Sequence, residues 1–229
     1  MFNSEKAINH PYCAYITFKN IEFSFYGGGS LISAKHVLTN AANIVGFPSW
    51  SVGLGSNLRS EQTIYQSDKA SSHPQYKEQN SLRNFDIGII ILKQAIRFTS
   101  TIYPVALPTM GALLAENTQG MVLGFAKATS TGGSAGQELQ SAHVRVTSNA
   151  RCLQFYAGAD FAQHFCGEDK DFRSNFCLGD QGGSFTILNR GSEVIMGIAS
   201  LPSCSATQPS VYTRISPTLR QWIRNETQL

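Results

Sequence analysis

Short runs of apolar and β-branched residues, several of them alternating with polar residues, recur along the chain. Gly, Pro, Asn and Ser bound these runs, and their length and spacing predict strands of an all-β sandwich or barrel. The runs cover residues 15–20, 22–27, 30–34, 36–40, 49–55, 87–92, 120–125, 142–148, 183–189, 193–200 and 210–215. A helix is expected only near the C-terminus, where Leu219, Trp222 and Ile223 form an apolar stripe after Pro217.

The segment from Pro104 to Gln119 carries few strand signals, which predicts a linker between two β-rich halves. We therefore expect an N-terminal barrel at about 14–105, a linker at about 106–119, and a C-terminal barrel with its helix at about 120–229. Together they form one domain over residues 1–229.

Composition narrows the classes of function. A hydrophobic fraction of 42% is enough for a sizeable core and argues against a disordered chain. Only 14% of the residues are charged and the net charge is +3. The chain therefore lacks the dense basic patch that is typical of a nucleic-acid-binding protein. No apolar run reaches the length of a membrane span, since the longest candidate, GIIILKQAI, is interrupted by Lys93. Nucleic acid and membrane are therefore not expected partners.

The five cysteines stand at positions 13, 152, 166, 177 and 204. Their spacing does not match a zinc site, so neither a metal nor another cofactor is expected. Two disulfides with one cysteine left over fit better, and they imply an oxidising, extracellular compartment. The sequon Asn225-Glu226-Thr227, a candidate glycosylation site, agrees with secretion.

Four segments in order resemble the trypsin/chymotrypsin family of serine proteases: GGSLISAKHVLTNAAN (28–43), FDIGIIIL (85–92), CLGDQGGSF (177–185) and PSVYTRI (209–215). With the EKA and PY segments near the start and the terminal helix, the resemblance spans the whole chain. It implies an all-β fold of two six-stranded antiparallel barrels of the trypsin type, with the active site in the crevice between them.

The family's chemistry needs a serine nucleophile, a histidine base and a buried aspartate that orients the histidine. In the ungapped match Ala42 stands at the histidine position and Gln181 at the serine position, so that only Asp86 is retained. A one-residue insertion would place Asn43 at the histidine position instead. The family also has a disulfide whose two positions fall on Gly27 and Asn43, and its joint loss favours Ala42.

Methyl and carboxamide groups can act neither as a general base nor as an activatable nucleophile. The resemblance thus implies a protein without catalytic residues. The five histidines (His10, His36, His73, His143 and His164) are interpreted as structural or surface residues.

The specificity pocket also departs from the family pattern. Asn175 stands at its base and Phe176 follows where the family has a small residue, so a phenyl ring should fill the cavity. The strand that pairs with the substrate backbone becomes Ser200-Leu201-Pro202, and proline has no N–H to donate. Ser210 replaces a glycine of the pocket wall. We interpret the pocket as occluded.

The resemblance implies three further features. The disulfides of the C-terminal barrel would be Cys152–Cys166 and Cys177–Cys204, which leaves Cys13 without a partner. Asp180 would form the family's ion pair with the N-terminal residue, at the place of Met1. The alternative interpretation of Cys13, which has no obvious disulfide partner, is that it is simply a small buried hydrophobic residue.

More specifically, the chain resembles mite proteases of the group 3 allergen type, and among them the inactivated serine protease paralogues of the scabies mite. That group implies a secreted, monomeric pseudoprotease that binds host serum proteins through surface loops, such as 56–85 or 127–138, and inhibits complement. This expectation rests on the resemblance alone.

Two other classes remain. A hydrolase with a rearranged site would need a nucleophile near Gly179, and neither Ser184 nor Ser200 has a base beside it in the pattern. A heparin or microbial-surface binder, like the inactive homologue azurocidin, would need a basic cluster. The basic residues are scattered instead: Lys69, Lys77, Arg83, Arg145, Arg151 and Arg173. An inert decoy is a third possibility.

Overall fold

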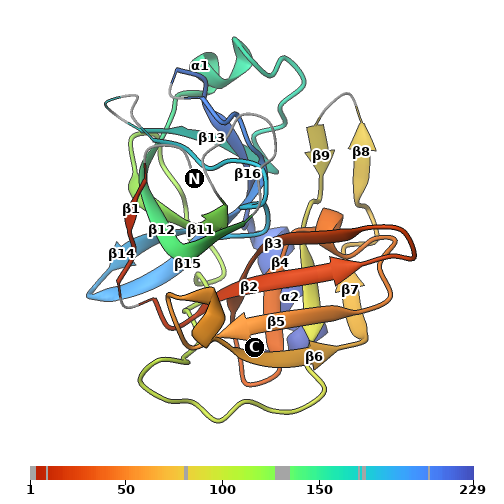
Figure 1. Cartoon of the computed structure of the whole chain (residues 1–229). Helices are drawn as coiled ribbons and strands as arrows, with labels where there is room; N and C mark the ends of the chain where they lie inside the picture. The colour runs from red at the N-terminus through yellow and green to blue at the C-terminus, as the bar shows by residue number, and fades with distance from the viewer. Residues whose placement is uncertain are drawn as a thin grey trace.

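The computed structural model describes residues 4–8, 10–79, 82–126, 135–169, 171, 174–205 and 207–229. Two β-rich units stacked against each other make up the chain (Figure 1). The N-terminal unit contains β2 (Cys13–Lys19), β3 (Ser24–Leu31), β4 (His36–Thr39), β5 (Trp50–Leu54), β6 (Thr63–Ser67), β7 (Lys69–Ser72) and β10 (Gly88–Ile91), with the hairpin β8 (Lys77–Gln79) and β9 (Leu82–Asn84). The C-terminal unit contains β11 (Gln119–Ala126), β12 (Ala135–Val146), β13 (His164–Glu168), β14 (Ser184–Asn189), β15 (Ser192–Leu201) and β16 (Ser210–Arg214), joined by β1 (Glu5–Lys6).

The C-terminal sheet closes into a barrel. Its order is β12-β11-β14-β15-β16-β13, and a further antiparallel pairing of β12 with β13 completes the ring. This is the predicted closed barrel. The strand β1 adds to the outer edge of β12, so the first described residues lie on the C-terminal unit.

The N-terminal sheet runs β6-β5-β2-β3-β4-β10-β7, with β6 and β7 at its two edges. Only Asp68 separates β6 from β7 in the chain, so the two edges are joined by one bent segment. Ser67 Oγ lies at this bend, 2.6 Å from the carbonyl oxygen of Ile91 and 2.8 Å from that of Lys69. The expected all-β architecture of two antiparallel units with a C-terminal helix is thus confirmed, with one closed barrel and one sheet curled into a partial barrel.

The C-terminal helix α2 (Pro217–Thr227) forms where it was predicted. Ser216 caps its first turn by accepting the N–H of Leu219, and Pro217 occupies the first turn, where its missing N–H costs nothing. Leu219 and Ile223 are buried in a core cluster made largely of N-terminal strands, so the helix crosses from its own barrel to the other one. A short helix, α1 (Asn149–Leu153), and the 3₁₀ turns η1 (Ala41–Asn43) and η2 (Arg59–Glu61) complete the secondary structure of the described residues.

The two units share an apolar core. The cluster that fills the N-terminal sheet also includes Leu123, Phe125, Ile195 and Ile198 of the C-terminal barrel, while a second cluster around Phe165 and Tyr212 fills that barrel. Segments from both units therefore meet in fixed positions at the junction, where the sequence places the candidate site. No helix among the described residues is long and apolar enough to cross a membrane.

Candidate functional site

Three positions far apart in the sequence converge between the two units. Ala42 lies in η1, Asp86 follows β9, and Gln181 lies in the loop before β14. The backbone N–H of Ala42 donates to Asp86 Oδ1 at 3.0 Å. Ala42 and Gln181 both line an open cavity of about 540 Å³. The structure thus brings together the three residues that the resemblance assigns to the triad positions.

Asp86 is fully buried, and three groups donate to its carboxylate. Besides the Ala42 N–H, Ser200 Oγ donates at 2.5 Å and Asn40 Nδ2 at 3.3 Å. Burial raises the pKa of Asp86 above its usual value, although these donors and the nearby Arg83 oppose the shift. The groups facing the carboxylate are amides and a hydroxyl, none of which can carry a proton to or from a substrate near neutral pH.

Asn40 was not identified as a site residue from the sequence. It lies directly after the buried strand β4, and its side chain is completely buried. A polar residue that follows an apolar strand and has no exposure needs a partner, which here is Asp86. The sequence signal for Asn40 was a carboxamide directly after the apolar run of the HVLTNAAN segment. Only the fold shows that this side chain reaches Asp86.

The described histidine contacts are made with groups other than the Asp86 carboxylate. The ring of His73 stacks on Phe85, with centroids 4.6 Å apart, and also approaches Trp222. His164 Nε2 is 3.1 Å from the carbonyl oxygen of Arg83. Burial lowers the pKa of both His36 and His73. Among the described contacts, no histidine bonds to Asp86.

Gly27 and Asn43 lie against each other, as the proposed register requires. A Cβ atom built on Gly27 would collide with the side-chain amide of Asn43. That amide donates to Thr39 Oγ1 and to the carbonyl oxygen of Gln181, both at 3.1 Å. Asn43 therefore ties η1 to the 179–183 loop by hydrogen bonds, at the place where the resemblance puts a disulfide in the family.

The side chain of Gln181 folds back onto its own loop. Its Oε1 accepts the backbone N–H of Gly179 at 2.6 Å. Gly179 has a φ of +93°, a conformation that glycine adopts without strain. In the family, the N–H groups at the Gly179 and Gln181 positions stabilise the oxyanion of the reaction intermediate. One of these two donors is therefore already taken by the carboxamide.

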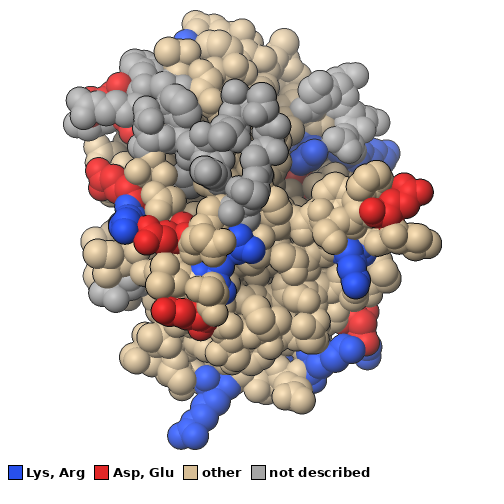
Figure 2. Space-filling view, in the orientation of Figure 1, with Lys and Arg blue, Asp and Glu red and all other residues tan. Residues whose placement is uncertain are grey.

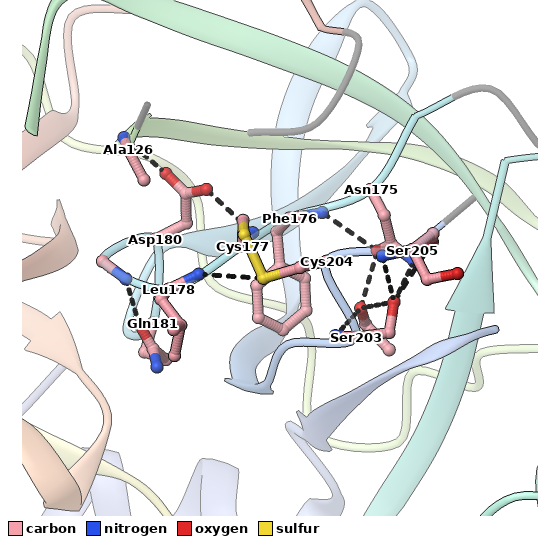
Figure 3. The surroundings of a disulfide bond; sticks show 12 residues. Ala126, Asn175, Phe176, Cys177, Leu178, Asp180, Gln181, Ser203, Cys204 and Ser205 are labelled. Carbon is pink, nitrogen blue, oxygen red and sulfur yellow. Dashed lines mark hydrogen bonds between the residues drawn. A yellow bond between two sulfur atoms is a disulfide. The ribbon is translucent and has the colours of Figure 1, made fainter. Parts of the chain in front are cut away.

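The specificity-pocket positions are filled by protein. Asn175, Phe176 and Ser210 are fully buried, and the Phe176 ring packs edge-on against Tyr212 with centroids 5.1 Å apart. Figure 3 shows Asn175 turned toward the 203–205 segment, where its Nδ2 donates to Ser203 Oγ at 2.8 Å. Ser210 Oγ donates to Asn175 Oδ1 at 2.6 Å, so the pocket base is a closed polar network.

The segment expected to pair with a substrate backbone, residues 200–202, also makes contacts within the protein. Leu201 ends β15 and pairs with Val211, and Pro202 follows it. Arg83 Nη1 donates to the carbonyl oxygen of Ser200 at 3.4 Å. The hairpin β8–β9 that carries Arg83 packs Leu82 among Cys152, Cys166 and Val211 of the other unit. This hairpin therefore lies across one side of the crevice.

The structure contains the disulfides Cys152–Cys166 and Cys177–Cys204, and Cys13 is a buried thiol whose pKa is raised by burial. Asp180 is fully buried and accepts the N–H groups of Ala126 at 2.9 Å and Cys177 at 3.0 Å (Figure 3). Met1, its expected partner, lies outside the described residues.

Asn225 is exposed on α2, where Gln221 donates to its side-chain oxygen at 2.9 Å. The hydroxyl of Thr227, the third residue of the sequon, donates to the carbonyl oxygen of Ile223 at 2.7 Å. On the face shown in Figure 2, basic and acidic side chains are dispersed over a mostly uncharged surface. Within the described residues, no group of three or more His, Cys, Asp and Glu side chains is placed to hold a metal.

Two packed antiparallel β-units with this convergence at their junction define a protein of the chymotrypsin-like serine protease class. The sequence profile of the trypsin family matches residues 2–223, and the chain belongs to that family. Human cathepsin G is 30% identical over 220 residues, which cover 94% of this chain and 82% of the relative. Bovine chymotrypsin-like elastase family member 1 is 28% identical over 208 residues, covering 86% and 77%.

Solved structures agree with this assignment. That of HL collagenase superposes with a TM-score of 0.85 at 25% sequence identity and covers 100% of this chain and 99% of its own. The structure of GrC has a TM-score of 0.86 at 24% identity, with 100% of both chains covered, and supports the fold alone.

Proposed function

We propose that this chain is a secreted, catalytically inactive member of the trypsin family that acts by binding other proteins. The observation that carries the proposal is the set of groups around Asp86, because its carboxylate receives two amide N–H groups and a hydroxyl but no imidazole. Proton transfer by a general base is essential to the family's mechanism, and a methyl group at Ala42 offers no lone pair for it.

Two further features support inactivity. The Gln181 carboxamide is not a nucleophile, and it also occupies the Gly179 N–H that would stabilise an oxyanion. Phe176 and Asn175 fill the positions where a substrate side chain would enter. The losses of the nucleophile and the base, the occupation of one oxyanion donor and the filled pocket together leave no step of acyl transfer supported.

The finer proposal concerns the partner. We propose that the protein binds host serum proteins through surface loops and inhibits complement, as the resemblance to inactivated mite paralogues implies. The two disulfides support an extracellular location. A catalytically inactive fold that retains its disulfides and a core shared by both units is suited to holding surface loops in place for binding.

The test has two parts. Purified protein is incubated with chromogenic peptide substrates and a fluorophosphonate probe; neither hydrolysis nor labelling is expected, and labelling of any serine would refute inactivity. Human serum is then treated with the protein and scored for complement-mediated lysis of sensitised red cells, with an active trypsin-family protease inhibited by a covalent reagent as the matched control. Lysis that equals the control would refute the complement proposal while leaving inactivity intact.

A further inference from the structure

Two cavities adjoin on the outer face of the C-terminal barrel. One has a volume of about 280 Å³ and the other of about 290 Å³, and Gln119, Gly120 and His143 line both. The strands β12, β11 and β14, which carry most of the lining residues, lie on the left side of the upper unit in Figure 1. No described residue that lines either cavity also lines the cavity at the triad positions. We call the two adjoining cavities the barrel trough.

The alternation of side chains along the strands places polar groups in this trough. Ala142 and Val144 of β12 are buried in the core of the barrel. His143 and Arg145 alternate with them and therefore lie on the outer face. Met121 of β11 stands opposite His143 in the sheet and lies on the same face. The trough is thus formed by the outer side of strands whose inner side fills the barrel.

Arg145 is the residue that points to a ligand. It lines the trough, and its Nε atom is buried without a hydrogen-bond partner among the described residues. Glu168 stands opposite it on β13, but that carboxylate accepts Nε and Nη2 of Arg151, both at 3.3 Å. A buried donor without a partner is unfavourable, and a guanidinium binds a carboxylate through two parallel hydrogen bonds. The trough therefore offers Arg145 to the carboxylate of a ligand.

The cavity that contains Arg145 also carries a surplus of acidic side chains. Glu5, Asp169 and Asp171 are among its lining residues. Asp169 is engaged within its own loop, where its two oxygens accept the Asp171 N–H and the Ser174 hydroxyl, both at 2.7 Å. A ligand with only a carboxylate would be repelled by this surplus of negative charge, whereas an additional ammonium group would be attracted by it. The charges are therefore complementary to a small zwitterion.

The second cavity is more apolar. Met121, Ile187 and Leu188 are among its lining residues, and the side chain of Leu188 is 75% exposed. Glu193, which also lines it, lies 3.2 Å from His10 Nδ1 and so already has a partner. An apolar ligand group that covers Leu188 would remove apolar surface from water. Cavities of this size suit one small molecule, because drug-sized ligands occupy pockets of about 300–1,000 Å³.

We propose that the barrel trough binds a free amino acid with an apolar side chain, such as leucine or phenylalanine. Its carboxylate bonds to Arg145, its ammonium group faces the acidic residues Glu5 and Asp171, and its side chain covers Met121 and Leu188. A residue within a polypeptide has neither charge and a terminal residue has only one of them, so a free amino acid matches the trough best. The site goes beyond the proposed function, since neither inactivity nor complement inhibition depends on it.

The probes are leucine and three analogues that each lack one group. N-acetyl-leucine lacks the ammonium group, leucinamide lacks the carboxylate, and glycine lacks the apolar side chain. Each is titrated against the full chain by saturation-transfer difference NMR, in a buffer without other amines or carboxylates. We expect leucine to bind with a Kd of about 1 mM or tighter, a range open to a ligand of about nine heavy atoms. Each analogue should bind at least about tenfold more weakly, and absence of saturable leucine binding would overturn the proposal.

Arg145→Gln should weaken leucine binding at least about tenfold, because the charged contact with two hydrogen bonds is lost. It should leave the weak binding of leucinamide unchanged. The matched control Arg97→Gln removes an exposed arginine outside the trough and should bind leucine as wild type does. Thermal midpoints within a few degrees of wild type show that each variant is folded. Equal weakening by both changes, or of both ligands by Arg145→Gln, would contradict the proposal.

Leu188→Ser should weaken leucine binding about threefold to tenfold, because part of the apolar surface that the ligand covers is removed. Glycine binding should not change. The matched control is Leu113→Ser, which removes a side chain that is 88% exposed and lies outside the trough. If Leu188→Ser weakened glycine as much as leucine, or if the control weakened leucine equally, the assigned place of the ligand's side chain would be wrong.

Other occupants give different results. N-acetyl-leucine that binds as tightly as leucine would overturn the proposal in favour of a simple anion site. Leucinamide that binds as tightly would overturn it in favour of the N-terminal residue of a polypeptide. Dimerisation in sedimentation runs that depends on Leu188, without leucine binding, would overturn it in favour of a second copy of this chain. The fluorophosphonate and lysis assays do not involve the trough, so failure of the proposed function and failure of this site are distinguishable.

Discussion

Restoring the residues of the triad should restore a reactive serine but not peptide hydrolysis. The perturbation is Ala42→His combined with Gln181→Ser. The first change places an imidazole on a residue whose backbone already bonds to Asp86. The second supplies a hydroxyl and, by removing the carboxamide, frees the Gly179 N–H. We therefore expect the double variant to react with a fluorophosphonate probe that needs no specificity pocket.

In the double variant we expect substrate binding to remain blocked for three reasons. With Phe176 in place, a substrate side chain forgoes burial that is worth about 1.5–3 kcal/mol. Pro202 leaves one substrate carbonyl without a donor, at about 1–3 kcal/mol, and displacing Arg83 from the Ser200 carbonyl costs about 1 kcal/mol more. The total of about 3.5–7 kcal/mol corresponds to a factor between about 10² and 10⁵ in kcat/KM.

The assay compares the double variant with an active trypsin-family protease on chromogenic substrates of trypsin, chymotrypsin and elastase type. Labelling without turnover is the expected result. Adding Phe176→Ala to the double variant should not restore turnover. The change removes a ring from the core and lowers the free energy of unfolding by about 3–5 kcal/mol. Turnover by the double variant within tenfold of the active protease would refute the occluded pocket, and absence of labelling would refute the geometry assigned to Ala42 and Asp86.

Three other predictions concern the scaffold. The double change Gly27→Cys with Asn43→Cys should form a disulfide and raise the free energy of unfolding in urea by about 1 kcal/mol. Closing the loop contributes about 3 kcal/mol, but the two hydrogen bonds of the Asn43 side chain are lost. If a variant with serine at both positions were equally stable, this prediction would be wrong. Thiol titration should detect no reactive cysteine in the native protein and one, Cys13, after denaturation without reductant; a native reaction would contradict its burial. Burial lowers the pKa of His73, so the unfolded chain takes up a proton that the folded chain does not, and stability should fall as the pH drops below about 6.5. His73→Phe should reduce that fall, and equal pH dependence of the two proteins would refute the assignment.

The apolar strands could be predicted from sequence and the polar ones could not. The runs at 87–92 and 210–215 are rich in β-branched residues and became β10 and β16. The segment TIYQSDKASS became β6 and β7 without having been expected, because most of its side chains are exposed or half-buried and its pairing is decided by β5 and β10. The strand β13 was also missed, since its pattern is short and fully buried.

The candidate site, too, could be predicted from the sequence only in part. Motif spacing was enough to place Ala42, Asp86 and Gln181, because residues next to a recognisable strand or tight loop keep their position in the fold. It did not reveal that Asn40 and Arg83 reach Asp86 and Ser200, since a flexible side chain can take several directions from the same backbone position.

The sequence by itself therefore determined the architecture, the cysteines available for pairing and the chemical identity of each residue at the triad positions, because these follow from local pattern and residue type. Only the tertiary structure decided which groups share a buried space. It turned the Gln181 amide onto Gly179, enclosed Asn175 in a polar network, and left the Phe23 ring in solvent. The physical reason is that hydrogen bonding and burial are properties of neighbours in space, and neighbours distant in the chain are brought together only when the barrels pack.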